Sequence, residues 1–173
     1  MTNPLVINLF AAPGVGKSTT AAGLFYKLKT AGVNAEMSRE YAKEVVWRGS
    51  LQTLEDQLHI FGEQHHRLFS LKKDVDVIIT DCPLLMQLIY SQSYPDWFSQ
   101  TVKWAFDQYN NHNYLLTRTK PYNPKGRTQT LEESDQKQVE ILDLLSKYTV
   151  DYQETKGNEE GLNFIYDDII NRL

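Results

Sequence analysis

The sequence reads LVINLF-AAPGVGKS at residues 5–18, and this stretch decides the fold. Residues 5–10 form a short apolar run between Pro4 and a turn of alanine, proline and glycine, a pattern typical of a strand buried on both faces. Apolar residues then recur at helical spacing over 17–29, and Gly32 follows as a helix stop signal. The chain is therefore expected to open with a strand, a glycine-rich turn and a helix.

Residues 11–18 match the Walker A pattern, except that Ala11 replaces the first glycine. The glycines allow backbone N–H groups to face phosphate oxygens, and the helix that follows directs the positive end of its dipole at them. A purely structural turn would not need the consecutive Gly-Lys-Ser-Thr. We expect ATP to bind here, with Ser18 as a ligand of Mg²⁺. The expected nucleotide-binding residues are Ala12, Pro13, Gly14, Val15, Gly16, Lys17, Ser18 and Thr19.

Strand and helix patterns alternate along the rest of the chain. Further strands are expected at 33–37, 74–80, 113–118 and 150–154, and further helices at 41–48, 53–73, 84–90, 97–109, 131–148 and 159–172. This alternation predicts an α/β fold, the three-layer sandwich of P-loop NTPases, with a five-stranded, mainly parallel sheet and helices on both faces. The length of 173 residues fits a single domain, residues 1–173, with a lid at about 119–130.

The composition argues against several classes of protein. No apolar run approaches the roughly 20 residues that a membrane span needs. The net charge of −4 argues against extensive non-specific binding of nucleic acid. Cys82 is the only cysteine, so no disulfide can form within the chain, and the amino terminus has no export leader pattern. A cytoplasmic protein is expected.

Two acidic residues follow predicted strands. Asp81 comes directly after the most apolar strand, so it is expected beside the phosphates, where it would hold Mg²⁺ or accept a proton from the acceptor. Glu40 ends the second strand and is the other candidate base, and Arg39 is a candidate clamp for an anionic acceptor. A polar turn cap at Asp81 and a surface ion pair at 39–40 are the structural alternatives.

A basic loop with no acidic residue follows the fourth predicted strand. Arg118 and Arg127 are expected to stabilise charge on the phosphates, the latter on a hinged lid. Lys125 and Tyr122 of the same loop are candidates for substrate binding, Tyr122 by stacking on a base. A solubilising surface turn is the structural alternative.

The chain lacks the Asn-Lys-x-Asp element of small GTPases, and it is more compact than motor ATPases. A kinase is therefore favoured over an ATPase or switch subunit. Metal binding by His59, Glu63 and His66 on the long helix is disfavoured against a polar helix face. The aromatic residues Trp47, Trp97, Trp104 and Tyr109 are expected mostly in the core.

Four segments together resemble small P-loop nucleotide and nucleoside kinases over nearly the whole chain. They are the Walker A run, Ser38-Arg39-Glu40-Tyr41-Ala42, Thr80-Asp81-Cys82-Pro83 and Arg118-Thr119-Lys120-Pro121. The chain looks most like bacteriophage 5-hydroxymethyluracil DNA kinases of the thymidylate kinase family, and more distantly like ribosylnicotinamide kinase.

This resemblance implies that Gly14, Gly16, Lys17 and Ser18 bind ATP-Mg²⁺, that Asp81 is the catalytic carboxylate, and that Arg118 and Arg127 face the phosphates. It also implies a modified base in DNA as the acceptor, in the host cytoplasm. Thymidylate and adenylate kinases have Asp-Arg after the third strand, whereas Cys82 follows Asp81 here. This difference favours a hydroxyl over a monophosphate acceptor. A nucleoside or ribosylnicotinamide kinase and a deoxynucleoside monophosphate kinase remain alternatives.

Overall fold

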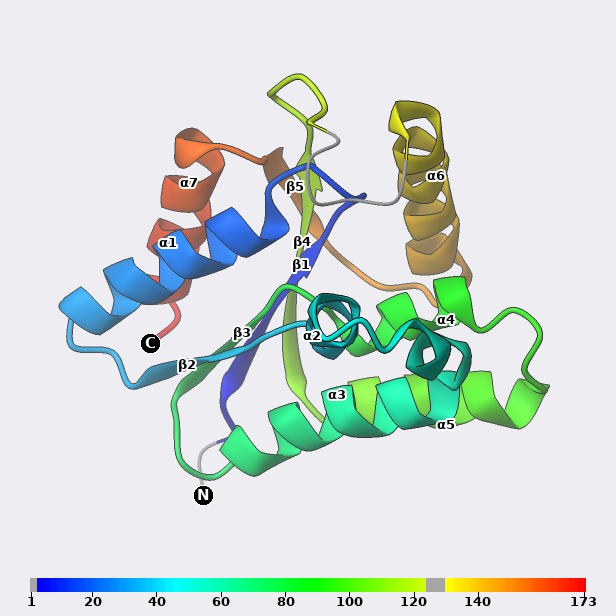
Figure 1. Ribbon diagram of the computed structural model, residues 1–173. Helices are drawn as coiled ribbons and strands as arrows, with labels where there is room; N and C mark the ends of the chain where they lie inside the picture. Colours follow the sequence, from blue (N-terminus) through cyan, green and yellow to red (C-terminus); the bar gives the residue numbers. More distant parts are fainter. Residues whose placement is uncertain (1–2, 124–129) are drawn as a thin grey trace.

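The computed structural model describes residues 3–123 and 130–173, and the elements below are those of this part of the chain (Figure 1). The strands are β1 (Leu5–Phe10), β2 (Ala35–Ser38), β3 (Val77–Thr80), β4 (Asn110–Thr117) and β5 (Gln153–Lys156). The α-helices are α1 (Lys17–Thr30), α2 (Tyr41–Trp47), α3 (Gln57–Leu71), α4 (Gln87–Tyr90), α5 (Asp96–Asp107), α6 (Leu131–Lys147) and α7 (Glu159–Ile170). Two 3₁₀ turns, η1 (Leu51–Glu55) and η2 (Leu84–Met86), precede α3 and α4.

The five strands form one parallel sheet in the order β2-β3-β1-β4-β5. Strand β1 is central and pairs Leu5 with Val77 of β3 on one side and with Asn110 of β4 on the other. All pairings are parallel, so the carboxyl ends of the strands lie at one edge of the sheet, and the strand order reverses between β1 and β3. That edge is where open α/β sheets bind their ligands.

Helices cover both faces of the sheet, which confirms the predicted sandwich. Helices α1 and α7 pack on one face, and α3, α5 and α6 on the other (Figure 1). Side chains of β1 alternate between the two cores, because successive strand residues point to opposite faces. Ile7 and Leu9 join the core under α1, whereas Val6 and Phe10 join the core under α3 and α5.

Several predicted boundaries were wrong. The last strand covers 153–156 and not 150–154, because its pairing with Tyr114–Thr117 of β4 sets its position and its Gln-Glu-Thr-Lys sequence carries no apolar signal. The single helix expected at 53–73 is η1 followed by α3, because the Asp56 side chain accepts a hydrogen bond from His59 N and starts a new helix.

The expected core position of the tryptophans was also wrong. The exposed fractions are 77% for Trp47, 51% for Trp97 and 61% for Trp104, whereas Tyr109 is buried. Helical spacing alone does not say which face of a helix meets the sheet. No helix in the described part of the chain is long and apolar enough to cross a membrane.

Candidate functional site

The phosphate loop lies between the carboxyl end of β1 and the start of α1. Gly14 and Gly16 have φ angles of 85° and 121°, which side chains with a Cβ rarely adopt. Helix α1 starts after Gly16 without a side-chain cap, so no side chain occupies its first N–H groups in place of an anion. The Lys17 ammonium folds back over the loop and donates to Ala11 O at 2.6 Å. Of the other predicted residues, Val15 is buried and Thr19 is exposed.

Asp81 joins the ends of three strands. It is buried at the end of β3, where its Oδ2 accepts a hydrogen bond from Ser18 Oγ at 2.6 Å and its Oδ1 accepts one from Glu40 N at 3.1 Å. The fold thus brings the two predicted Mg²⁺ ligands into direct contact. A hydroxyl and a carboxylate next to a phosphate loop are the oxygen donors that Mg²⁺ uses in such sites, with water and phosphate completing the octahedron. These residues fit the ion.

Glu40 is half-buried at the start of α2, where its backbone N–H bonds to Asp81. Burial raises the pKa of Glu40 above its ordinary value of 4.5, Lys17 opposes this shift and Asp81 adds to it. A carboxylate whose charged form is poorly solvated is a stronger proton acceptor than one in water. Arg39, by contrast, is exposed, and its carbonyl accepts a hydrogen bond from Arg67.

Arg118 follows the end of β4 and does not stand in an acid-free environment. Its Nη1 lies 2.9 Å from Asp135 Oδ1, its Nη2 donates to Ser134 Oγ at 2.6 Å, and its guanidinium lies 5.4 Å from the ring centre of Tyr122. The prediction considered only residues of the basic loop, whereas the acidic partner, Asp135, comes from helix α6. Tyr122 is half-buried, not exposed as expected. Lys125 and Arg127 lie outside the described residues.

Helix α6 also holds the phosphate loop, which the sequence did not indicate. Gln138 Oε1 accepts a hydrogen bond from Ala12 N at 2.9 Å, and Ser134 Oγ donates one to Pro13 O at 2.7 Å. These pairs are separated by more than 120 residues in the sequence, and nothing in a single sequence links them. Only the capping box of Thr130 and Glu133 marks the start of this helix in the sequence.

The connection after β5 supports the loop from another side. Gly157 N donates to Thr117 O at 2.8 Å, and a Cβ on Gly157 would overlap the Val15 carbonyl oxygen. The backbone approaches so closely that only glycine fits without a shift. Gly157 is therefore a residue of the site that sequence analysis missed, although a glycine after a strand is a possible signal.

The other candidates considered in the sequence, the histidines of α3 and Cys82, lie in surroundings that do not support a catalytic or metal-binding role. His59 Nε2 lies 2.9 Å from Tyr41 Oη, and within the described ranges no group of three His, Cys, Asp or Glu side chains is arranged to hold a metal ion. Cys82 is buried, and burial raises the pKa of its thiol well above its usual range, which opposes a role as nucleophile.

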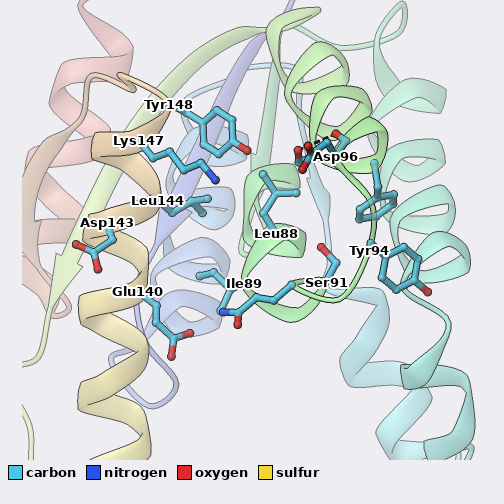
Figure 2. A pocket seen from close by; sticks show the side chains of 13 residues that line it. Leu88, Ile89, Ser91, Tyr94, Asp96, Glu140, Asp143, Leu144, Lys147 and Tyr148 are labelled. Carbon is cyan, nitrogen blue, oxygen red and sulfur yellow. Dashed lines mark hydrogen bonds between the residues drawn. The ribbon is translucent and has the colours of Figure 1, made fainter.

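A cavity of about 420 Å³ lies between α4, the start of α5 and the second half of α6 (Figure 2). Its lining includes Leu88, Tyr94, Leu144, Lys147 and Tyr148. None of the residues predicted for the site lines it, so it is separate from the phosphate loop.

The comparisons with known proteins agree with this geometry. The AAA_28 family, described as an AAA domain, matches residues 6–160, which include nearly all of β1, the phosphate loop, Glu40, Asp81 and all of α6. No curated protein matches the chain. The match covers most of the chain, and the fold and the Walker A loop are those of nucleotide-binding ATPases and kinases. The chain therefore belongs to the AAA_28 family of P-loop NTPase-type domains.

Proposed function

We propose that this protein is an ATP-dependent kinase that transfers the γ-phosphoryl group to a hydroxyl acceptor. The observation that carries the proposal is the position of Glu40, half-buried beside Lys17 and Asp81 at the carboxyl edge of the sheet. A hydroxyl that attacks the γ-phosphorus loses its proton, and a carboxylate beside the phosphates can receive that proton.

The contacts divide the roles of the two acids. Both oxygens of Asp81 already accept hydrogen bonds, from Ser18 and from the backbone of Glu40, which suits a residue that holds the metal side of the site. Glu40 presents the second carboxylate, and we assign it the role of general base. The position of the base was left open between these two residues by the sequence.

The phosphate side of the site supplies charge stabilisation. Backbone N–H groups of the loop and the Lys17 ammonium would bind the phosphate oxygens, and Arg118 would join them after leaving Asp135. Mg²⁺, when held by Ser18 and Asp81, neutralises charge on the triphosphate. Arg127 and Lys125 remain proposed lid residues on sequence grounds alone.

For the acceptor, we propose the 5-hydroxymethyl group of a uracil base in DNA. The resemblance of the four segments supports this choice, as does Cys82 in place of the arginine that would grip a monophosphate. Tyr90 is 49% exposed and lies within electrostatic reach of Glu40, and Lys137 Nζ lies 5.3 Å from its ring centre. A flat base would stack on such a ring. Arg39 is the other candidate contact to the acceptor.

The experiment is phosphoryl transfer from γ-labelled ATP. Label should enter DNA that contains 5-hydroxymethyluracil and should not enter matched DNA with thymine. Transfer to free nucleosides or to ribosylnicotinamide alone would replace the DNA acceptor with the nucleoside alternative. Transfer to deoxynucleoside monophosphates would support the third alternative.

A second candidate function is an ATPase or switch subunit, and the match to the AAA_28 family favours it. In that case ATP would be hydrolysed without an acceptor, at a rate that a protein partner raises. Hydrolysis by the wild type that rises with a protein partner, with no transfer to any acceptor, would select this function over the kinase.

A further inference from the structure

Helix α6 grips the phosphate loop at two points one helical turn apart. Ser134 and Gln138 lie at positions i and i+4 of α6, so both side chains project from the same face of the helix. Ser134 is fully buried and Gln138 is half-buried. Ser134 bonds to Pro13 O and Gln138 to Ala12 N, so together they fix two neighbouring residues at the start of the loop.

The chemistry of the groups determines which atoms donate. Ala12 N–H has only a proton to give, so the partner atom on Gln138 must be the amide oxygen. Pro13 has no N–H, and Ala12 therefore carries the last backbone donor before Gly14. With this donor turned toward α6, the loop begins in one fixed direction. The conformational freedom of Gly14 and Gly16 is restricted to the turn around the phosphates.

Ser134 also connects the loop to Arg118. A guanidinium can only donate and a carbonyl can only accept, so the single hydroxyl proton of Ser134 points to Pro13 O while its lone pairs accept from Arg118 Nη2. Hydrogen bonds in such a chain strengthen one another. The position of Arg118 is thus transmitted to the phosphate loop through one hydroxyl.

We infer that Ser134 and Gln138 are positioning residues that preorganise the phosphate loop for the triphosphate, and that Ser134 couples the loop to Arg118. This inference rests on the proposed nucleotide site and extends it to a helix that has no Walker motif. A preformed loop loses less conformational entropy on binding, which raises affinity without a new contact to the ligand.

The test measures ATP-Mg²⁺ affinity by calorimetry on Gln138→Ala, with Gln136→Ala as the control on an exposed position of the same helix. Loss of one hydrogen bond of typical strength weakens affinity about fivefold. KM for ATP should rise by a similar factor with kcat unchanged, because the variant weakens binding of the ground state and of the transition state equally. The melting temperature should fall by only about 2–4 °C, the effect of one lost hydrogen bond in a chain of this size.

Gln138→Glu adds a charge readout. It keeps an oxygen that accepts from Ala12 N, so a role in folding alone predicts wild-type behaviour. A role beside the triphosphate predicts weaker ATP binding, because the new carboxylate repels the phosphates, and salt should reduce the difference.

Coupling is tested by Ser134→Ala, Arg118→Ala and the double variant. The effects on ATP affinity should not add, since both single variants break the same chain of hydrogen bonds. Additive effects would overturn the coupling, and wild-type affinity in Gln138→Ala would overturn the positioning role. An affinity loss in Gln138→Ala that disappears at temperatures where the variant is fully folded would also overturn it. If the wild type bound no nucleoside triphosphate at all, the proposed function would fail together with this inference.

Discussion

Glu40 and Glu44 lie one helical turn apart at α2, yet their surroundings shift their pKa values in opposite directions. Glu44 accepts hydrogen bonds from Arg67 Nη1 at 2.7 Å and Arg67 Nη2 at 2.9 Å, and this pairing lowers its pKa. Burial beside Asp81 raises the pKa of Glu40. The charge of Glu44 is therefore compensated by Arg67 of α3, whereas Glu40 carries a charge that the fold solvates poorly. A carboxylate with a raised pKa at a ligand-binding edge indicates a catalytic role, whereas a carboxylate paired with an arginine indicates a structural role.

The largest difference in transfer rate is expected between variants of the two cations, Lys17 at the phosphate loop and Arg67 beside Glu44. Lys17→Ala is expected to abolish transfer, a loss of at least about 10³-fold, because positioning and charge stabilisation supply most of the catalysis in phosphoryl transfer. Arg67→Ala should leave the transfer rate within a few-fold, since the Arg67 guanidinium pairs with Glu44 of α2. Initial rates with labelled ATP measure both. Near-normal turnover in Lys17→Ala would contradict the site assignment.

The two acids provide the second comparison. Glu40→Gln should lower kcat about 10²-fold or more, because an amide cannot take the proton from the substrate hydroxyl. ATP affinity should change little. Glu44→Gln should retain kcat. Single-turnover transfer and ATP binding, measured on both variants, separate chemistry from binding. Equal rates for the two variants would move the base to Asp81.

For stability the expectation is reversed, because the Glu44 variant should lose stability and the Glu40 variant should gain it. Glu44→Gln removes a half-exposed ion pair of roughly 0.5–1 kcal/mol, equivalent to a melting temperature about 2 °C lower. Glu40→Gln should raise the melting temperature at neutral pH, because burying the charged form of Glu40 costs stability. Thermal unfolding of the nucleotide-free proteins measures both shifts. A lower melting temperature for Glu40→Gln would mean that its charge is well paired.

The smallest effect is the pH dependence of these differences. The lowered folded-state pKa of Glu44 gives stability that is present above its ordinary value of 4.5 and is lost as pH falls through the lowered pKa. The raised folded-state pKa of Glu40 makes the wild type lose stability as pH rises from 4.5 through the raised pKa. Glu44→Gln should therefore approach the wild type in acid, and the advantage of Glu40→Gln should vanish below pH 4.5. Melting curves from acid to neutral pH test both signs.

The fold followed from local patterns where those patterns were strong. Val77–Thr80 and Leu5–Phe10 are apolar enough to indicate buried strands, and the Walker A run indicates the loop between β1 and α1. Strand β5 was misplaced because its sequence is polar and its position depends on pairing with β4. The start of β4, residues 110–112, was missed for the same reason, since its Asn111 is held by a hydrogen bond from the Asn8 side chain.

The sequence by itself determined the class of the domain and the phosphate loop, because glycine torsion, helix dipole and a lysine at fixed spacing are local properties. It also placed Asp81 and Glu40 at strand ends. Only the tertiary structure decided that Asp81 bonds to Ser18, that Asp135 pairs with Arg118, and that α6 holds the loop. These are contacts between segments far apart in the chain, and their partners become neighbours only when the sheet order and helix packing bring them together.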